Sequence, residues 1–153
     1  MKLTLILLLL ITSLMAVVGA FLTTSVSSFF IDSFYEQMNS VFGVGQRDFV
    51  ADLRSAADEE NGAELIREML DTNAGPLGID YRSRNFFVLD GDTGSYLSGS
   101  ADQSALPREQ SLNLLTARNA VASGDETAVG ADSDIAADYM DVAVPILGEN
   151  LSY

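Results

Sequence analysis

The sequence predicts an α+β fold, in which a long N-terminal helix precedes an antiparallel sheet with flanking shorter helices. Residues 3–31 carry no charged side chain, and apolar residues recur every three or four positions beyond that run. From about residue 85 the pattern changes to short apolar or alternating runs bounded by turn residues, which is typical of strands. Without the apolar run about 130 residues remain, enough for one modest domain.

The charge-free run predicts a transmembrane anchor over residues 1–25. About 20 apolar residues in a helix cross a hydrocarbon core of about 30 Å. Lys2 precedes the run, whereas Asp32 and Glu36 are the first charges after it. Because basic residues favour the cytoplasmic side, we expect the N-terminus inside, a single visible span in the cell membrane, and an extracytoplasmic domain.

A cleaved secretory signal is the competing interpretation. Val18, Gly19 and Ala20 place small residues where a signal peptidase tolerates them. Apolar residues continue from Phe21 to Phe34, however, and a signal core is usually about 7–15 residues long. The uncleaved anchor is therefore favoured, and a buried helix of a soluble protein ranks below both.

Residues 26–60 predict a long juxtamembrane helix, because no Gly or Pro follows the anchor until Gly43. The apolar stripe of this helix comprises Val26, Phe30, Phe34, Met38 and Val41 or Phe42. Gly43 and Gly45 indicate a bend, after which helical spacing continues to residue 58. The stripe fits packing on its own domain and pairing with a second copy equally well. The expected partners are the lipid bilayer and a second copy of the chain, with which it forms a homodimer.

Residues 61–153 predict the folded domain. A short amphipathic helix at Ala63–Asp71 ends at Asn73-Ala74-Gly75-Pro76, since Gly suits a C-cap and Pro cannot continue a helix. Two strands, 85–89 and 95–98, are joined by a tight turn. A second helical segment opens at Leu106-Pro107 and stops at Gly124. One of its sides carries Leu112, Leu115, Val121 and Ala122.

The last segment predicts further strands. Residues 139–147 alternate, with one face formed by Met140, Val142, Val144 and Ile146. A short strand is also suggested at 127–129. Because the sequence ends on the apolar triplet Leu151-Ser152-Tyr153, which looks like the opening of another strand, we expect the domain to be incomplete at its C-terminus.

Composition excludes several classes of protein. Cysteine and histidine are both absent, so Ser–His–Asp and Cys–His catalysis, disulfides, thiolate metal sites and a phospho-accepting histidine are impossible within this chain. Carboxylates are numerous, but no spacing singles out a pair for hydrolysis. The net charge of −14 repels nucleic acid and attracts cations or basic peptides. We therefore expect no enzyme activity, no catalytic residues and no cofactor in this chain.

Two acidic segments invite a metal-site interpretation. Residues 90–94, DGDTG, match the start of a calcium loop, but Gly94, Ser95 and Ala101 occupy positions that such a loop fills with a ligand, a glycine and a glutamate. A hairpin turn is favoured there. The cluster of Asp132, Asp134, Asp138 and Asp141 would form at best a weak all-oxygen site, and a solvated loop is favoured. No metal site is predicted.

Several segments together resemble a known family. They are VSSFFIDSFY at 26–35, NFFVLD at 85–90, GSYLSGS at 94–100, LNLLTA at 112–117 and YMDVAVPI at 139–146. This pattern resembles the N-terminal sensor region of membrane-bound histidine kinases of Gram-positive two-component systems, over nearly the whole chain. It is a pattern of elements and contains no catalytic signature.

The resemblance implies a PAS-like domain of the Cache type, followed in the parent protein by a second span and a cytoplasmic kinase that this sequence does not contain. It implies an input role, in which a small ligand, cation or peptide shifts helix 26–58 and the anchor with it. The implied ligand pocket lies over the sheet, near Phe87, Tyr96, Tyr139 and Asp141. The same module in a chemoreceptor or a cyclic-dinucleotide enzyme, and a secreted or anchored acidic binding protein, remain alternatives.

Overall fold

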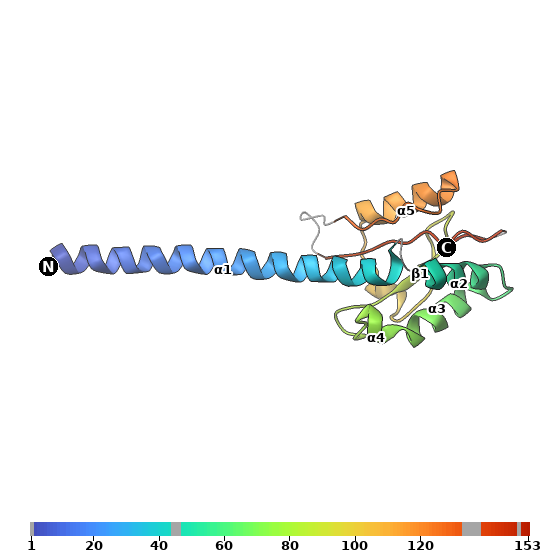
Figure 1. The fold of residues 1–153 in the computed structure, drawn as a ribbon, viewed down its shortest axis with the longest axis horizontal. Coiled ribbons are helices and arrows are strands. Elements are labelled where there is room, and N and C mark those ends of the chain that lie inside the picture. Colours follow the sequence, from blue (N-terminus) through green and yellow to red (C-terminus); the bar gives the residue numbers. More distant parts are fainter. Residues whose placement is uncertain (1, 44–46, 133–138, 150) are drawn as a thin grey trace. The chain divides into compact units, whose positions relative to one another are not determined.

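The computed structural model describes residues 2–43, 47–132, 139–149 and 151–153 (Figure 1). The chain divides into two units, Met1–Phe34 and Tyr35–Tyr153. Helices account for most of the regular structure, and the described residues contain one small antiparallel sheet. The α+β class predicted from the sequence is confirmed at this level.

The first unit consists of helix α1, which runs from Lys2 to Phe42 and so continues into the second unit. An 18-residue window of α1 has a mean hydropathy of 2.8, and none of that window is buried within the chain. The hydroxyls of Thr12, Thr23 and Thr24 donate to backbone carbonyls three or four residues earlier, which satisfies them without water. By its length and composition α1 is a candidate membrane span. A signal sequence near the N-terminus would meet the same criteria.

The second unit begins with the last turns of α1, which ends where the sequence predicts a bend. The Gly43 N–H donates to the Asn39 carbonyl at 2.8 Å. A Cβ at position 43 would lie 2.2 Å from that oxygen, so glycine is needed for this exit. Helix α2 (Arg47–Ala57) follows, and the rings of Phe42 and Phe49 lie 5.9 Å apart. The helical stretch expected over 26–58 is thus described as two helices.

Two helices follow where the sequence predicts one. Helix α3 (Gly62–Thr72) buries Ile66 and Leu70, and packs against α2 and both strands (Figure 1). It ends at Asn73, as predicted. Gly75 and Pro76 do not leave the helical conformation, however. They belong to a short helix α4 (Ala74–Leu77), because a proline within the first turn has no hydrogen bond to lose.

The sheet has the predicted pair of strands. Strand β1 (Phe87–Leu89) pairs antiparallel with β2 (Tyr96–Gly99), in a register that matches Val88 with Ser98 and has an irregularity between Val88 and Leu89. The predicted turn between them is observed: the Gly94 N–H donates to the Asp90 carbonyl at 2.7 Å.

Helix α5 (Leu112–Ser123) stops at Gly124, as predicted, with φ of 69° in the left-handed region. Its start differs from the expectation. A short 3₁₀ helix η1 (Gln103–Ala105) comes first, and α5 begins after Ser111, whose hydroxyl accepts from the Leu114 N–H. The buried side also differs, because α5 buries Asn113, Ala117 and Ala120 and leaves Leu112 and Leu115 exposed.

The prediction of an alternating strand at 139–147 is wrong. The described residues there contain only isolated bridges, Gly130 with Ala143 and Leu147 with Ser152. Pro145 and Ile146 are adjacent and both buried, so alternation fails, and a proline cannot donate to a ladder. The segment at 127–129 likewise forms no strand. Residues 151–153 do run back alongside the segment that precedes them, since Ile146 and Tyr153 exchange two backbone hydrogen bonds of 2.8 Å.

Candidate functional site

Two of the four predicted ligand residues lie together on the sheet. Phe87 of β1 and Tyr96 of β2 pack edge to face, with ring centroids 6.3 Å apart and an interplanar angle of 64°. The Tyr96 hydroxyl donates to the Ala101 carbonyl at 3.1 Å. Both rings are half-buried, so the pair stabilises the hairpin and the chain that follows it.

The other two lie beside the start of α5. The Ser111 hydroxyl donates to Asp141 Oδ2, and Asn113 Nδ2 donates to Asp141 Oδ1 at 3.0 Å. The Tyr139 hydroxyl donates to the Glu109 carbonyl at 2.9 Å. These partners differ from those of Phe87 and Tyr96, which pack on each other and on the Ala101 carbonyl. The ligand role of the four residues therefore stays a prediction.

Asn113 explains why this region is polar and yet buried. Only 2% of its surface is exposed. Its amide oxygen accepts from the Asp132 N–H at 2.8 Å, and its nitrogen donates to the carbonyls of Asp132 and Asp141, each at 2.9 Å. Buried amides need such partners, and these tie three segments together. Asp141 thus has a structural role at the start of α5.

The acidic segments show no assembled metal site within the described residues, where no group of three or more metal-binding side chains comes together. Asp134 and Asp138 of the predicted cluster lie outside the described residues. Asp90 Oδ1 accepts from the N–H and the hydroxyl of Thr93, each at 2.7 Å. The Thr93 hydroxyl is the main cause of a lowered pKa of Asp90, as expected for a carboxylate that stabilises a turn.

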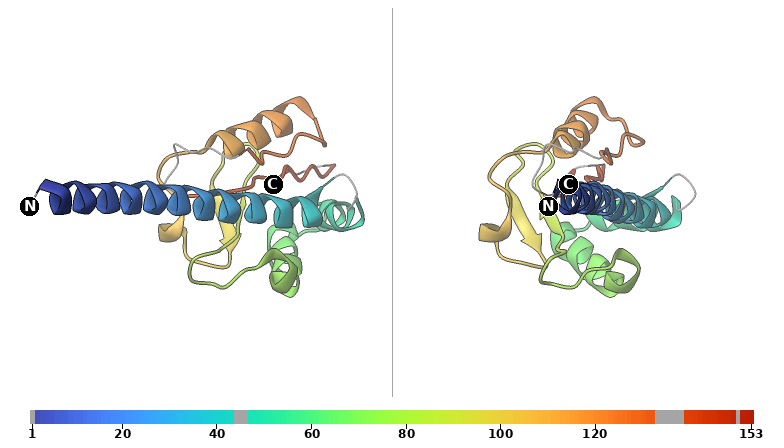
Figure 2. Two further views of the ribbon diagram at one scale, coloured as in Figure 1. Left: turned by 60° about the vertical axis from the view of Figure 1, so that its left-hand side comes forward. Right: turned by 90° about the vertical axis from the view of Figure 1, so that its left-hand side faces the viewer.

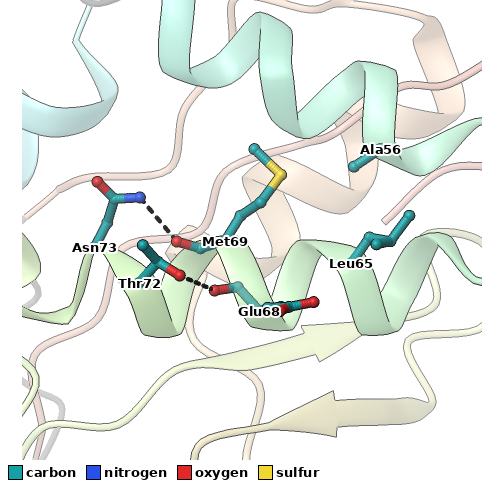
Figure 3. Close-up of a pocket in the computed structure, with 6 residues that line it drawn as sticks. All are labelled: Ala56, Leu65, Glu68, Met69, Thr72 and Asn73. Atoms are coloured by element: carbon teal, nitrogen blue, oxygen red, sulfur yellow. Dashed lines mark hydrogen bonds between the residues drawn. The ribbon is translucent and has the colours of Figure 1, made fainter.

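A shallow groove of about 450 Å³ lies between α2 and α3 (Figure 3). Its lining residues are Ala56, Leu65, Glu68, Met69, Thr72 and Asn73. Thr72 and Asn73 donate to the Glu68 and Met69 carbonyls, so these polar groups are satisfied within the helix. The exposed surface of the groove is more apolar than polar, and the groove is open to solvent. Sequence reasoning missed the groove because it depends on how two helices pack.

The C-terminal turns of α1 are held by an arrangement that we call the α1 joint, formed by Gln37, Arg84 and the carbonyls of Pro76 and Leu77. Gln37 Nε2 donates to the Pro76 carbonyl at 2.8 Å. Arg84 Nη1 donates to Gln37 Oε1 at 2.7 Å and to the Leu77 carbonyl at 3.2 Å. Both side chains are half-buried. One amide therefore links α1 to the end of α4 and to the loop that follows.

The backbone around Arg84 is fixed by Asp80. Asp80 Oδ1 accepts from the N–H groups of Arg82, Ser83 and Arg84 at 2.8–2.9 Å, and the Ser83 hydroxyl donates to Oδ2 at 2.5 Å. These bonds, that of the Ser83 hydroxyl above all, hold the pKa of Asp80 far below its usual range. An ionised carboxylate thus shapes the loop that carries Arg84.

The same loop contains a strained residue. Tyr81 has φ of 60°, which a residue with a Cβ rarely adopts, and its ring is half exposed. Its hydroxyl donates to Asp71 Oδ1 at 2.7 Å, and this bond is the main cause of the raised pKa of Tyr81. The loop is therefore tied both to the end of α3 and, through Arg84, to α1.

Two further contacts hold the same end of α1. The Tyr35 hydroxyl donates to the Asp132 carbonyl at 3.0 Å, and Met38 is buried. Asp132 also bonds Asn113, so α1 is connected with the start of α5. Sequence reasoning placed Met38 on the apolar stripe, without deciding what covers it, and missed Gln37 and Arg84. Partners 47 positions apart leave no signal in local spacing.

Comparison of the chain with protein-family models, curated proteins and solved structures finds no match in any of the three.

Proposed function

We propose that this chain is the extracytoplasmic signal-sensing region of a membrane-bound two-component histidine kinase, with a PAS-like domain of the Cache type. The observation that carries the proposal is the continuity of α1. The helix contains the charge-free run and ends in residues that the α1 joint holds. A helix without interruption is suited to carry a displacement along its axis.

The mechanism follows from what the α1 joint connects. A ligand or contact that favours one arrangement of the loop 79–84 would move Arg84, and Gln37 with it. The anionic surface favours a cation or a basic peptide as the signal. Since α1 is one element from Lys2 to Phe42, a shift or rotation at Gln37 would reach the anchor and, in the parent protein, the kinase.

The test compares two insertions in the intact parent protein. Gly-Gly or Ala-Ala is inserted after Thr24, so that both variants have the same length and differ in helix stability by about 2 kcal/mol. Each is combined with Gln37→Ala, which releases the α1 joint without any need to know the signal. The readout is histidine phosphorylation in membrane vesicles. We expect Gln37→Ala to change phosphorylation in the Ala-Ala background and to have no effect in the Gly-Gly background. An equal effect in both backgrounds would contradict transmission through α1.

A membrane-anchored or secreted acidic binding protein is the second candidate. The net charge of −14 favours it, because an acidic surface attracts cations or basic peptides without any need for a helix that transmits or for a kinase. N-terminal sequencing of the mature protein distinguishes an uncleaved anchor from a cleaved signal. The coding sequence downstream of Tyr153 distinguishes a kinase from a chemoreceptor, a cyclic-dinucleotide enzyme or a binding protein.

A further inference from the structure

The charge-free run of α1 is longer than a membrane needs. Figure 2 shows α1 as one uninterrupted helix through this run. At a rise of about 1.5 Å per residue, the 29 residues from 3 to 31 extend over about 43 Å, whereas a hydrocarbon core is about 30 Å thick. Tilt does not remove the excess, because at about 40°, the upper end of the usual range, the run still covers about 33 Å. Part of the run therefore lies outside a core of ordinary thickness.

The excess falls at the C-terminal end of the run. Lys2 holds the start of the run near one membrane surface, since a charged side chain is costly inside the core. Counted from there, residues 3–22 already supply the roughly 20 apolar residues that cross about 30 Å. We call the remaining residues, 23–31, the exit segment.

The first part of the exit segment is polar and yet does not depend on water. Residues 23–28 comprise five serines or threonines and one valine. The hydroxyls of Thr23 and Thr24 donate to the carbonyls of Gly19 and Ala20, each at 2.9 Å. A hydroxyl that is bonded within its own helix loses little when lipid replaces water around it. This part of the helix can therefore lie on either side of the membrane surface.

The second part of the exit segment carries two exposed aromatic rings. Phe29 is 68% exposed and Phe30 is 61% exposed, and their centroids lie 6.0 Å apart, edge to face. The bilayer is the occupant that fits these rings, because they lie on the same charge-free helix as the candidate span and Asp32 is the first charge after them. Burial of the rings in hydrocarbon offsets the cost of dehydrating the hydroxyls that precede them.

We propose that the exit segment makes a thickness-dependent contact with the bilayer: it lies in water beside a thin hydrocarbon core and enters a thick one. Each additional 1.5 Å or so of core draws in about one residue of an upright helix. Since α1 is a single helix as far as Phe42, its residues beyond the exit segment approach the membrane by the same amount. Membrane thickness is then a signal in its own right. The inference rests on the membrane anchor that the proposed function also uses.

The absence of cysteine allows a direct test on the full chain, because an introduced thiol is unique. Ser25→Cys places a reporter in the exit segment, Leu10→Cys places one within residues 3–22, and Ser33→Cys places one beyond the run. All three positions are exposed within the chain. The variants are reconstituted in phosphatidylcholine vesicles with acyl chains of about 14, 18 and 22 carbons, which bracket a core of about 30 Å. A charged maleimide on both sides of the membrane labels thiols that water reaches.

We expect the Ser25→Cys thiol to react at least about tenfold more slowly in the thickest bilayer than in the thinnest, because mismatch over several Å changes the equilibrium by about that factor. Leu10→Cys should be protected and Ser33→Cys labelled in all three bilayers. A Ser25→Cys rate that does not change with thickness would overturn the proposal, and slow labelling in all three is the result expected if a second copy covers the segment. Rapid labelling of Leu10→Cys would instead refute the anchor and the proposed function with it.

A charge variant shows whether the exit segment itself enters the core. Ser28→Glu in the Ser25→Cys chain should reduce the ratio of the two rates to about twofold or less, because a carboxylate is costly to immerse. Ser33→Glu is the matched control, since it adds the same charge beyond the run, beside Asp32, and should leave the ratio unchanged. A ratio measured on one variant cancels any effect of the new charge on the thiol. Equal effects of the two glutamates would overturn the proposal.

Discussion

Arg84 Nη1 and Gln37 Oε1 lie 2.7 Å apart and join the last turns of α1 to a loop 47 residues later. The nitrogen of the same Gln37 amide donates to the Pro76 carbonyl, so both the oxygen and the nitrogen of this amide are hydrogen-bonded. Asp80 fixes the backbone of Arg84 from the other side. A side chain that bridges two segments in this way couples their positions, because neither can move without breaking a hydrogen bond or moving the other.

The first prediction concerns the strength of this bridge. Gln37→Ala removes two hydrogen bonds and should lower the free energy of unfolding by about 1–3 kcal/mol. Arg84→Ala should show a similar loss, and the double variant should lose less than the sum, because the two residues share a bond. Thermal or urea unfolding of the full chain in detergent measures this. Gln103→Ala, on the exposed η1, is the control and should be near neutral. Additive losses would contradict the bridge.

The second prediction uses two glycines with the same backbone strain. Gly78 and Gly124 have φ of 64° and 69°, so an alanine costs about 1–2 kcal/mol at either position. At Gly124 the new Cβ meets nothing within 4 Å, whereas at Gly78 it would lie 2.4 Å from Arg84 Nη1 and 2.9 Å from Gln37 Nε2. These side-chain ends can move aside, but their hydrogen bonds are then lost.

Gly78→Ala should therefore destabilise the chain more than Gly124→Ala, by about 1–2 kcal/mol. In a Gln37→Ala background this excess should shrink, because the bonds that the Cβ would displace are already absent. Unfolding midpoints of the four variants in one detergent provide the comparison. An excess that is unchanged by Gln37→Ala would place its origin outside the α1 joint.

Local features of the fold could be predicted from the sequence. The charge-free run became the apolar part of α1, Gly124 ended α5, and the DGDTG segment formed a hairpin turn. Each depends on the conformational preference of a few neighbouring residues, and such preferences act wherever the segment lies.

Features that depend on distant partners could not be predicted. The apolar spacing of α5 indicated Leu112 and Leu115 as a packed side, but the polar contacts of Asn113 with residues 19 and 28 positions away turn another side inward. Alternation predicted a strand at 139–147, but Asp141 is held at the start of α5 and Pro145 cannot donate to a ladder. The α1 joint likewise lies between segments that no periodicity relates.

The third prediction tests Asn113 as the centre of these polar contacts. Asn113→Leu keeps the branching and the number of heavy atoms of the side chain but leaves the Asp132 N–H and the Asp141 carbonyl without this partner, which should cost about 2–4 kcal/mol. The exposed Asn119 on the same helix gives the control, and Asn119→Leu should change stability by less than about 0.5 kcal/mol. Circular dichroism during heating reports both. Equal effects would show that burial of Asn113 is unimportant.

Gly130→Ala provides an independent check of the same region. A Cβ at Gly130 would lie 2.2 Å from the Asn113 carbonyl oxygen, and this neighbour is backbone that cannot rotate away. The exchange of two hydrogen bonds between Gly130 and Ala143, at 2.8 and 2.9 Å, should then be lost. We expect destabilisation of several kcal/mol, on the order of a severe overpacking. Hydrogen exchange at the Ala143 amide would report the local opening, and full protection in the variant would contradict this contact.

The last prediction concerns pH and the loop that carries Arg84. The pKa of Asp80 is lowered in the folded chain by the Ser83 hydroxyl and three backbone N–H groups. A lowered pKa means that folding favours the ionised form, so the carboxylate stabilises the fold above its unfolded value of about 3.9. That contribution is lost as the pH falls through the lower folded value. Asp80→Asn should therefore be less stable than the natural chain at pH 7, and the difference between their melting temperatures should narrow steadily between about pH 5 and pH 2.

Asp52→Asn, at an exposed carboxylate for which the described residues show no side-chain hydrogen bond, should differ little from the natural chain. A difference for Asp80→Asn that stays constant across this pH range would mean that the ionised carboxylate does not hold the loop.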